Sequence, residues 1–431
     1  MAGGGGSRYA FANLAVQLSA LSALAIVPRA GLDFAKCAPL PLALLILASM
    51  ALPVLYLVPL PQAAWSAAPG RELVAASFEL VDRSWAPLSV DPVRTALAVT
   101  ALVTPFAALA IGLACSRDRL VLAGWVVVAC ALTSIVLGIP QTLFDGQDWL
   151  LYPENLMPNV LFGAFANRNS TGLFLVSALA LAAFLPVPRR LAQIAQIGRL
   201  ALLLLLLAGI VLTRSRTALV LALLPIGMFA LHAIRASAAA RKGGPTGKRE
   251  TMRGWLVPAT LIGAILVAGL IIIAAPGRVA DTIERFNTQG TGPRAYIWED
   301  ALYSAQRYWP IGAGTGTFDE LFQVDESLEN LAQRRAGRAH NDWLELAIEL
   351  GAPGLSLAAA WLCVLAWLAW RARRSHGRWI AWSGALILLG IALQSITDYP
   401  LRNQTMLAVA GFGLAVLVRF GEPSRRQRQR A

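Results

Sequence analysis

The chain contains three histidines, the side chains best suited to proton transfer near neutral pH. His232 lies at the end of an apolar run and His376 lies in a basic loop, whereas His340 directly precedes a segment of helical periodicity at 342–350. The positive end of such a helix disfavours the imidazolium form, so we expect His340 to be neutral and able to act as a general base. The alternative is a surface histidine that only hydrogen-bonds its own loop.

Arginines in the polar stretches form a second group with chemical potential: Arg214, Arg216, Arg278, Arg294, Arg334, Arg335 and Arg338. A guanidinium group binds phosphate through two parallel hydrogen bonds. At a membrane edge, a guanidinium group without a partner costs free energy. Arg214 and Arg216 lie in such a place, a very short turn between two strongly apolar runs. One histidine among several arginines suits a lipid-diphosphate substrate. Contact with lipid headgroups is the alternative, which we favour for Arg334 and Arg335.

Metal and nucleotide sites are not expected. The cysteines lie within or at the ends of apolar stretches and form no CxxC or CxxH pair, which favours simple packing for Cys37, Cys115, Cys130 and Cys363. A divalent cation is a disfavoured alternative for the acids of the first long polar segment, which lack an Asp-x-Asp pair: Glu72, Glu79, Asp82 and Asp91. The glycines at 312, 314 and 316 form either a backbone nest for an anion or, as we favour, a plain turn.

Composition indicates what kind of protein must position these residues. Of 431 residues, 57% are hydrophobic and 14% are charged, whereas soluble domains carry about 25% charged residues. This argues against a water-soluble enzyme, a disordered chain and a disulfide-stapled secreted protein. Eleven apolar segments suit membrane helices: 11–27, 37–60, 95–115, 120–139, 170–187, 200–213, 217–234, 255–275, 355–370, 379–396 and 405–418. We predict an all-α polytopic membrane protein with about 11–12 transmembrane helices. We expect the first helix to be retained, because no A-x-A-like cleavage site follows it.

Lysine and arginine in short loops predict the orientation. The loop at 235–253 carries six basic residues against one acid, the loop at 371–378 carries four arginines, and the tail after 418 carries five arginines and one acid. These stretches belong in the cytoplasm, so the net charge of +13 reflects topology and gives no separate support for nucleic-acid binding. Three longer segments then fall outside: 61–94, 140–169 and 276–354.

Two helices are expected in the longest external segment. Apolar residues recur at helical spacing over 298–309. The second helix, 342–350, carries an acidic stripe whose first members, Asp342 and Glu345, have capping-box spacing, and Gly351 ends it. Both helices suit a position flat on the membrane surface.

The segment from Arg338 to Gly354 (RAHNDWLELAIELGAPG) resembles the His-Asn-x-x-Leu…Glu-x-Gly signature of the O-antigen ligase and O-antigen polymerase superfamily. Further elements of that family are matched in the same order: 165–169 (FANRN), 212–216 (LTRSR), 294–318 (the start of the large periplasmic loop) and 397–401 (TDYPL). The resemblance spans roughly 150–415.

The resemblance implies a GT-C-like glycosyltransferase of the bacterial inner (cytoplasmic) membrane, with its active site facing the periplasm. Such enzymes take a glycan from undecaprenyl diphosphate and need neither a nucleotide sugar nor a metal, so no cofactor is expected. Carried onto this chain, the resemblance implies that His340 activates the acceptor hydroxyl and that the attack inverts the anomeric carbon. The diphosphate would be held by Arg216 and Arg294, with Arg214 and Arg278 as further candidates. The candidates for supporting roles are Asn341, Arg338, Arg168 and Asp398.

The remaining hypotheses about function differ in the molecule that accepts the glycan. We favour ligation to lipid A-core or a similar glycan acceptor, as in lipopolysaccharide biosynthesis. The alternative is a polymerase that joins lipid-linked repeats, and the family also includes enzymes that glycosylate proteins. A transporter or flippase of lipid-linked sugars is a more distant alternative. Transporters keep ionisable residues near the bilayer midplane, whereas these apolar segments are almost free of charge.

Three parts of the chain are expected. N-terminal transmembrane helices occupy 1–140, and an O-antigen ligase-like catalytic membrane domain occupies 141–418 with its periplasmic loop at 276–354. A basic cytoplasmic tail follows at 419–431. Family members commonly have both ends in the cytoplasm, which requires an even number of helices, whereas a count of eleven places the N-terminus outside.

Overall fold

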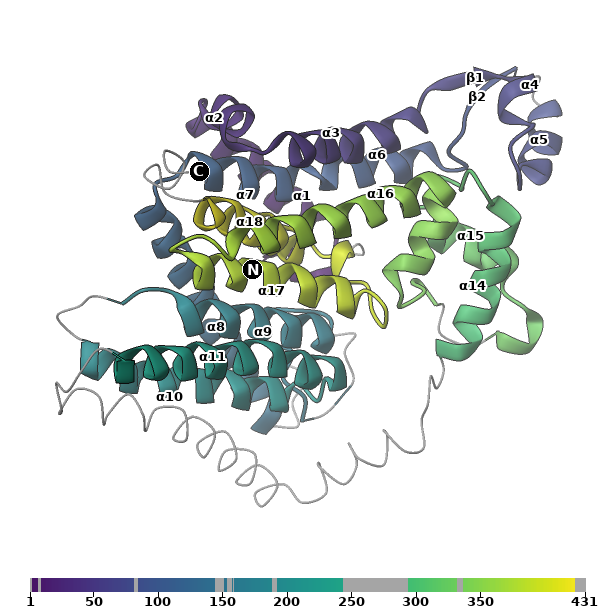
Figure 1. Cartoon of the computed structure of the whole chain (residues 1–431). Coiled ribbons are helices and arrows are strands. Elements are labelled where there is room, and N and C mark those ends of the chain that lie inside the picture. Colours follow the sequence, from purple (N-terminus) through teal and green to yellow (C-terminus); the bar gives the residue numbers. More distant parts are fainter. Residues whose placement is uncertain are drawn as a thin grey trace.

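The computed structural model describes residues 2–6, 9–80, 84–143, 151–152, 157, 159–187, 192–242, 294–331 and 336–422. Helices are the main secondary structure of this part of the chain and strands form only one short pair, which confirms the predicted all-α fold (Figure 1). The apolar segment predicted at 255–275 and three of the arginines singled out from the sequence, Arg278, Arg334 and Arg335, lie outside the described residues.

Six helical stretches of the described chain are long and apolar enough to cross a membrane: α6 with α7 (Pro92–Ala101 and Val103–Ala114), α8 (Arg117–Leu143), α10 (Ala192–Leu212), α11 (Arg216–Lys242), α16 (Asp342–Ala372) and α18 (Gln404–Gly421). A seventh results if α1 (Ala10–Ile26) and α2 (Ala30–Cys37), which are bent by 83° at their junction, form one span. Three shorter apolar helices are α3 (Leu40–Leu55), α9 (Arg168–Phe184) and α17 (Arg378–Gln394). The protein is therefore a multi-pass membrane protein.

Ten of the eleven predicted apolar segments are helical in the structure, but several of these helices are short. At 1.5 Å per residue, a helix of 16 or 17 residues measures about 25 Å, less than the ~30 Å of a bilayer core. α3, α9 and α17 have these lengths. Among the described residues, fewer helices therefore qualify as spans by length than the 11–12 that the whole sequence predicts.

The short helix α9 lies inside the bundle and contacts protein on every side. Each residue from Ser170 to Phe184 is buried, and the helix packs against α8, α10, α11 and α17. α18 packs between α7 and α17 in the same way. The outer helices instead carry exposed apolar side chains such as Leu47, Val126 and Val220, as expected for surfaces that face lipid.

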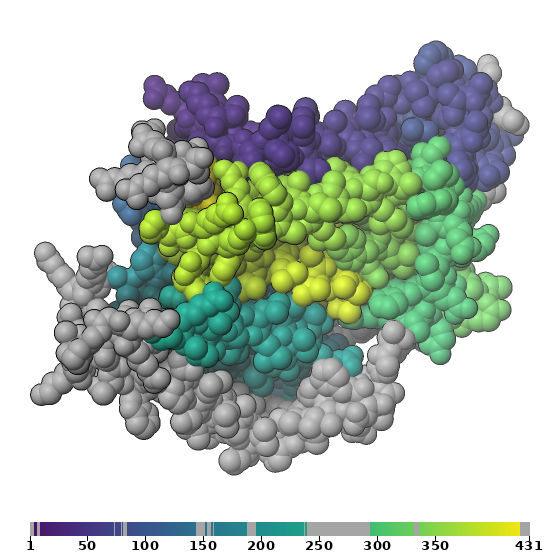
Figure 2. Space-filling model, viewed as in Figure 1, coloured from purple at the N-terminus to yellow at the C-terminus, as the bar shows by residue number. Residues whose placement is uncertain are grey.

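The polar segments gather at one end of the bundle. The first one forms an antiparallel pair of short strands and two short helices, and the second one forms two helices and a 3-10 turn: β1 (Pro59–Pro61), α4 (Gln62–Trp65), α5 (Glu72–Glu79), β2 (Trp85–Pro87), α14 (Arg294–Tyr308), α15 (Phe318–Asp325) and η4 (Leu328–Asn330). Figure 2 shows them next to each other, in violet-blue and green. Arg71 joins the two segments because its buried guanidinium donates to the Gly312 carbonyl (2.8 Å).

One face of α14 packs against protein. Ala301, Ala305 and Tyr308 are buried in a small core that α14 shares with α15 and the start of α16, where Phe318 and Ile348 complete it. Only part of the apolar stripe of α14 is therefore covered, because Leu302 and Trp309 are exposed.

α16 begins at the predicted residue, and its helical conformation is broken at Gly351, where the sequence predicted a helix end. Its N-cap is Asn341, whose side chain accepts from the N–H groups of Trp343 and Leu344, so the predicted capping box at Asp342 is wrong by one residue. At Gly351 the backbone turns to φ 56° and the helix kinks, then continues to Ala372. A Cβ at this position would lie 2.1 Å from the Pro310 carbonyl oxygen, which explains the glycine.

The short turn η1 (Ala2–Gly5) lies at the same end of the bundle as the polar segments. The Gly4 carbonyl accepts hydrogen bonds from the Ala166 N–H (3.1 Å) and from the Asn403 side chain (2.9 Å). Asn403 follows η5 (Pro400–Arg402), which connects α17 to α18. Residues 2–5 are therefore held at the end of the bundle that carries the polar segments.

Candidate active site

Four helices begin around the connection between α17 and α18, and each is tied to residues 394–398. Gln394 donates to the Asn169 carbonyl in α9 (2.9 Å), and the Thr397 hydroxyl lies 3.2 Å from the Thr217 hydroxyl in α11. α14 and α16 make the contacts described below. The N-terminal ends of helices carry partial positive charge. Their convergence therefore makes this region suitable for an anion.

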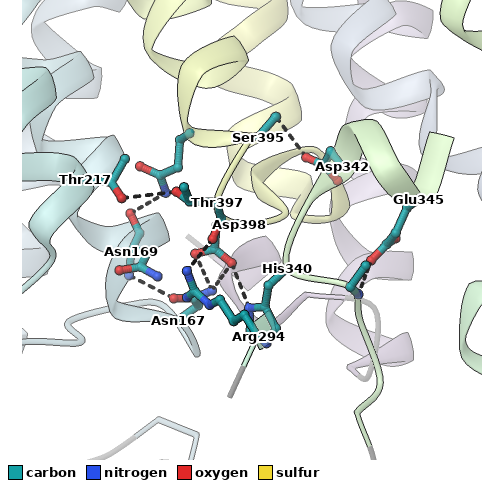
Figure 3. Close-up of polar contacts among 12 residues, drawn as sticks. Asn167, Asn169, Thr217, Arg294, His340, Asp342, Glu345, Ser395, Thr397 and Asp398 are labelled. Atoms are coloured by element: carbon teal, nitrogen blue, oxygen red, sulfur yellow. Dashed lines mark hydrogen bonds and ion pairs between the residues drawn. The ribbon is translucent and has the colours of Figure 1, made fainter. Parts of the chain in front are cut away.

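His340 lies in the turn that leads into α16, beside this connection. Its Nδ1 is 3.3 Å from Asp398 Oδ1, and 32% of its side chain is exposed against 1% for Asp398 (Figure 3). Its ring also lies 4.9 Å from the ring of Tyr399, centroid to centroid. Burial, aided by the nearby Asp398, raises the pKa of Tyr399 to about 12, so the packing partner is a neutral phenol.

Asp398 is the buried carboxylate that organises the site. The Asn167 side chain donates to both of its oxygens (3.1 and 3.0 Å). Burial alone would raise the pKa of Asp398, but contact with His340, the charge of Arg294 and a hydrogen bond with Asn169 hold it below its ordinary value. Asp398 is therefore ionised at neutral pH and can only accept hydrogen bonds.

The ionised carboxylate determines which nitrogen of His340 carries the proton. Because Asp398 only accepts, Nδ1 of His340 must be the donor, and in a neutral ring Nε2 is then the atom with a free lone pair. A buried carboxylate that holds the imidazole in one tautomer is the arrangement that general-base histidines use in many hydrolases. The sequence predicted His340 as the candidate base from the helix dipole, and the structure adds Asp398 as its partner.

Arg294 is a predicted arginine that the structure places beside this pair. It is the first residue of α14, and its Nη1 donates to the Thr397 carbonyl (2.6 Å). Figure 3 shows its guanidinium next to Asp398 and His340. Because Arg294 contacts the same connection that holds the histidine, a group bound by Arg294 lies close to the candidate base.

Three further arginines lie at or next to helix starts at this end. Arg168 is the first residue of α9 and Arg216 is the first residue of α11, directly before Thr217. Arg214 precedes α11 in a turn with φ 52°, a left-handed conformation that is unusual for a residue other than glycine. α9 and α11 thus each begin with an arginine at the end of the bundle that carries His340, and Arg294 is the first described residue of α14 there.

Arg338, a predicted supporting residue, pairs with a buried acid below His340. Its Nη1 lies 3.1 Å from Glu345 Oε2, and Asn341, also predicted to support the site, caps α16. Sequence reasoning missed the contacts of Asn167 and Thr397 with the site. The sequence feature that pointed to these two residues was the order of the FANRN and TDYPL segments. That order does not reveal that the two segments are in contact.

The glycine-rich turn at 312–316 does not form an open anion nest. Its amides are engaged within the protein: Gly312 donates to the Tyr308 carbonyl, Ala313 to Ile348 and Gly314 to Glu349. The favoured prediction of a plain turn is the one that these contacts support.

Comparison with known families and proteins agrees with the geometry. Residues 201–359 match the model of the O-antigen ligase family, and no curated protein matches the chain. The matched range contains α11, α14, His340 and the kinked first half of α16, whereas Asn167 and Asp398 lie outside it. The His-Asn segment lies within this match, which supports an assignment to the O-antigen ligase and polymerase superfamily.

Proposed function

We propose that the protein transfers a glycan from undecaprenyl diphosphate to an acceptor hydroxyl at the periplasmic face of the bacterial inner membrane. Membership of the superfamily supports a glycosyltransferase-type enzyme of O-antigen processing. The observation that carries the proposal is the pair formed by His340 and buried Asp398 beside Arg294. A base next to a fixed cation is what transfer from a lipid diphosphate requires.

The proposed reaction is a single displacement at the anomeric carbon of the donor. Nε2 of His340 takes the proton of the acceptor hydroxyl while that oxygen forms a bond to the anomeric carbon. The bond from this carbon to the phosphate oxygen breaks, and its electron pair leaves with undecaprenyl diphosphate. Attack from the face opposite the leaving group inverts the anomeric centre. General-base help of this kind contributes about 10²–10⁴-fold to the rate.

Arg294 and Arg216 are proposed to hold the diphosphate, with Arg214 in a further contact. Each guanidinium is permanently charged and binds phosphate oxygens in a fixed geometry. The helix N-termini at Arg216 and Arg294 add partial positive charge at the same place. These groups stabilise the negative charge that develops on the leaving diphosphate.

The acceptor is tested with purified protein and undecaprenyl-diphosphate-linked glycan repeats, with products separated by gel and mass. We favour a ligase, so the repeats should remain unchanged until lipid A-core is added and should then be transferred to it. Chains that lengthen on the lipid diphosphate without another acceptor would instead identify a polymerase. Donor binding without any transfer would favour a transporter or flippase of lipid-linked sugars and contradict the proposal.

A further inference from the structure

The backbone at His340 requires support from its surroundings. Its φ of 52° lies in the left-handed region, which non-glycine residues adopt only where contacts impose it. On the preceding side, the Ala339 carbonyl accepts from Trp298 Nε1 (2.8 Å) and the Ala339 N–H donates to Glu345 Oε1 (2.9 Å). On the following side, the Asp342 N–H donates to the Ser395 carbonyl (2.9 Å). The imidazole direction therefore depends on these few contacts.

Glu345 connects the turn before His340 to two arginines. Its side chain is fully buried, and one oxygen accepts from the Ala339 N–H. The other oxygen lies 3.1 Å from Arg338 and 3.1 Å from Arg402. A carboxylate bonded on both oxygens at 0% exposure has little freedom to move, so the peptide that it holds is fixed as well.

Arg402 anchors this contact to the part of the chain that carries Asp398. It pairs with Glu345 and with two more acids of α16, Asp342 (3.6 Å) and Glu349 (2.7 Å). Burial alone would lower the pKa of Arg402, but the three carboxylates raise it, so the cation persists. Arg402 lies in the same connection as Asp398. The segment with the histidine and the segment with its carboxylate are thus held together through Glu345.

We propose that Glu345 is a positioning residue that sets the direction of the His340 ring toward Asp398 and the acceptor hydroxyl. It acts through the Ala339 peptide and through its ion pairs, without touching the substrate. This inference rests on the proposed function, because it requires His340 to be the base. Since a misplacement of about 1 Å costs on the order of 10²-fold in rate, weakening this contact should lower kcat more than donor binding.

Glu349 offers a matched control for Glu345. It lies one helical turn later on α16, is equally buried and pairs with the same guanidinium at 2.7 Å. Within the described part of the chain, its carboxylate has no hydrogen bond to residues 338–340. Glu345→Gln and Glu349→Gln therefore each remove one charge from the network, but only the first weakens the hold on Ala339.

The test compares Glu345→Gln, Glu349→Gln and His340→Ala for thermal stability, binding of the undecaprenyl-diphosphate-linked glycan, and kcat for transfer to lipid A-core. We expect Glu345→Gln to lower kcat about 10-fold or more and Glu349→Gln less than about 3-fold, with donor affinity unchanged within about 2-fold in both. In the double variant of His340→Ala with Glu345→Gln, the second substitution should cause no further loss, because both act on one group.

Equal losses of kcat in the two glutamine variants would overturn the proposal, because Glu345 would then matter only for stability. Full activity of His340→Ala would overturn the proposed function itself. An inactive His340→Ala variant together with an unaffected Glu345→Gln variant would overturn only the positioning role. If Glu345→Gln does not fold, Trp298→Phe removes the other hydrogen bond to Ala339 and should lower kcat with donor affinity retained. An unchanged kcat in that variant would also contradict the proposal.

Discussion

The two ends of α16 carry charge in opposite ways. At its start, three buried carboxylates pair with the single guanidinium of Arg402. At its other end, Arg371 and Arg373 lie over the rings of Trp367 and Trp370, with guanidinium carbons 5.5 and 3.5 Å from the ring centroids. These arginines are not enclosed, and the tryptophan under the second one is exposed.

The difference shows where this protein accepts the cost of burying charge. Ion pairs removed from water rarely stabilise a fold more than apolar residues of the same size, so they need another reason to be present. At the start of α16 that reason is geometric, because the network holds the turn that carries His340. At its other end the arginines extend along aromatic rings, as expected for basic residues close to a membrane boundary.

The largest expected effect in this comparison belongs to Asp398→Asn. The amide has the same shape, but it can present its NH₂ group to Nδ1 and so place the ring proton on Nε2. We expect transfer to fall by about 10²–10⁴-fold, with the donor still bound. Asp118→Asn is the control, because Asp118 is an exposed acid at the opposite end of the bundle, in the first turn of α8. A rate within about 3-fold of wild type for Asp398→Asn would contradict the role of the pair.

Arginine substitutions at the two ends of the bundle should differ in their effect on donor binding. We expect Arg216→Ala and Arg294→Ala to weaken binding of the undecaprenyl-diphosphate-linked glycan by about 10–100-fold, because a charge-assisted hydrogen bond contributes about 1.5–3 kcal/mol. Arg373→Ala, at the other end of α16, should leave it unchanged. Binding is measured by titration of the purified variants, with His340→Ala included. Equal donor affinity in all four variants would contradict the proposed role of Arg216 and Arg294 in diphosphate binding.

A smaller effect, on stability, is expected at the kink that separates the start of α16 from its long membrane part. Gly351→Ala places a methyl group 2.1 Å from the Pro310 carbonyl oxygen and puts alanine in a left-handed conformation. We expect a loss of about 1–3 kcal/mol in the free energy of unfolding, seen as a lower Tm in detergent. Gly227→Ala in α11 has open space around it and should be neutral or slightly stabilising. Equal Tm values for the two variants would show that the kink is not constrained.

The smallest expected effect is a dependence of stability on pH. Because the pKa of Asp398 is lower in the folded protein than its ordinary value of about 3.9, the unfolded chain binds the proton more tightly. The stabilisation is therefore fully present above about pH 4 and is lost as the pH falls through the folded value. The difference in Tm between wild type and Asp398→Asn should be constant from about pH 5 to 8 and shrink in acid. A Tm difference that widens in acid would show that the pKa of Asp398 is raised in the folded protein and would contradict this prediction.

The apolar helices, and the polar segments that gather at one end of the bundle, were accessible from the sequence. Apolar segments mark α3, α8 and α18 directly, and basic loops separate the two ends of the bundle. The histidine and the arginines were identified by their position outside the membrane and by a family signature. These features depend on local composition, which a single sequence displays.

Contacts between distant segments were not accessible in the same way. Glu345 belongs to an acidic stripe that resembles a solvated helix face, yet it is buried because Arg402, far along the chain, covers it. Asn167 meets Asp398 across more than two hundred residues. The break at Gly351 was predicted from the glycine and the proline, whereas the close approach of Pro310 that requires a glycine there was not.

The most direct test of the account compares His340→Ala with His376→Ala in the transfer of a glycan from undecaprenyl diphosphate to lipid A-core. His376 is an exposed histidine in the turn between α16 and α17, at the opposite end of the molecule. We expect His340→Ala to lose at least about 10²-fold in transfer rate while it binds the donor like wild type, and His376→Ala to be fully active. Undiminished transfer by a folded His340→Ala variant would contradict the claim that this histidine is the base.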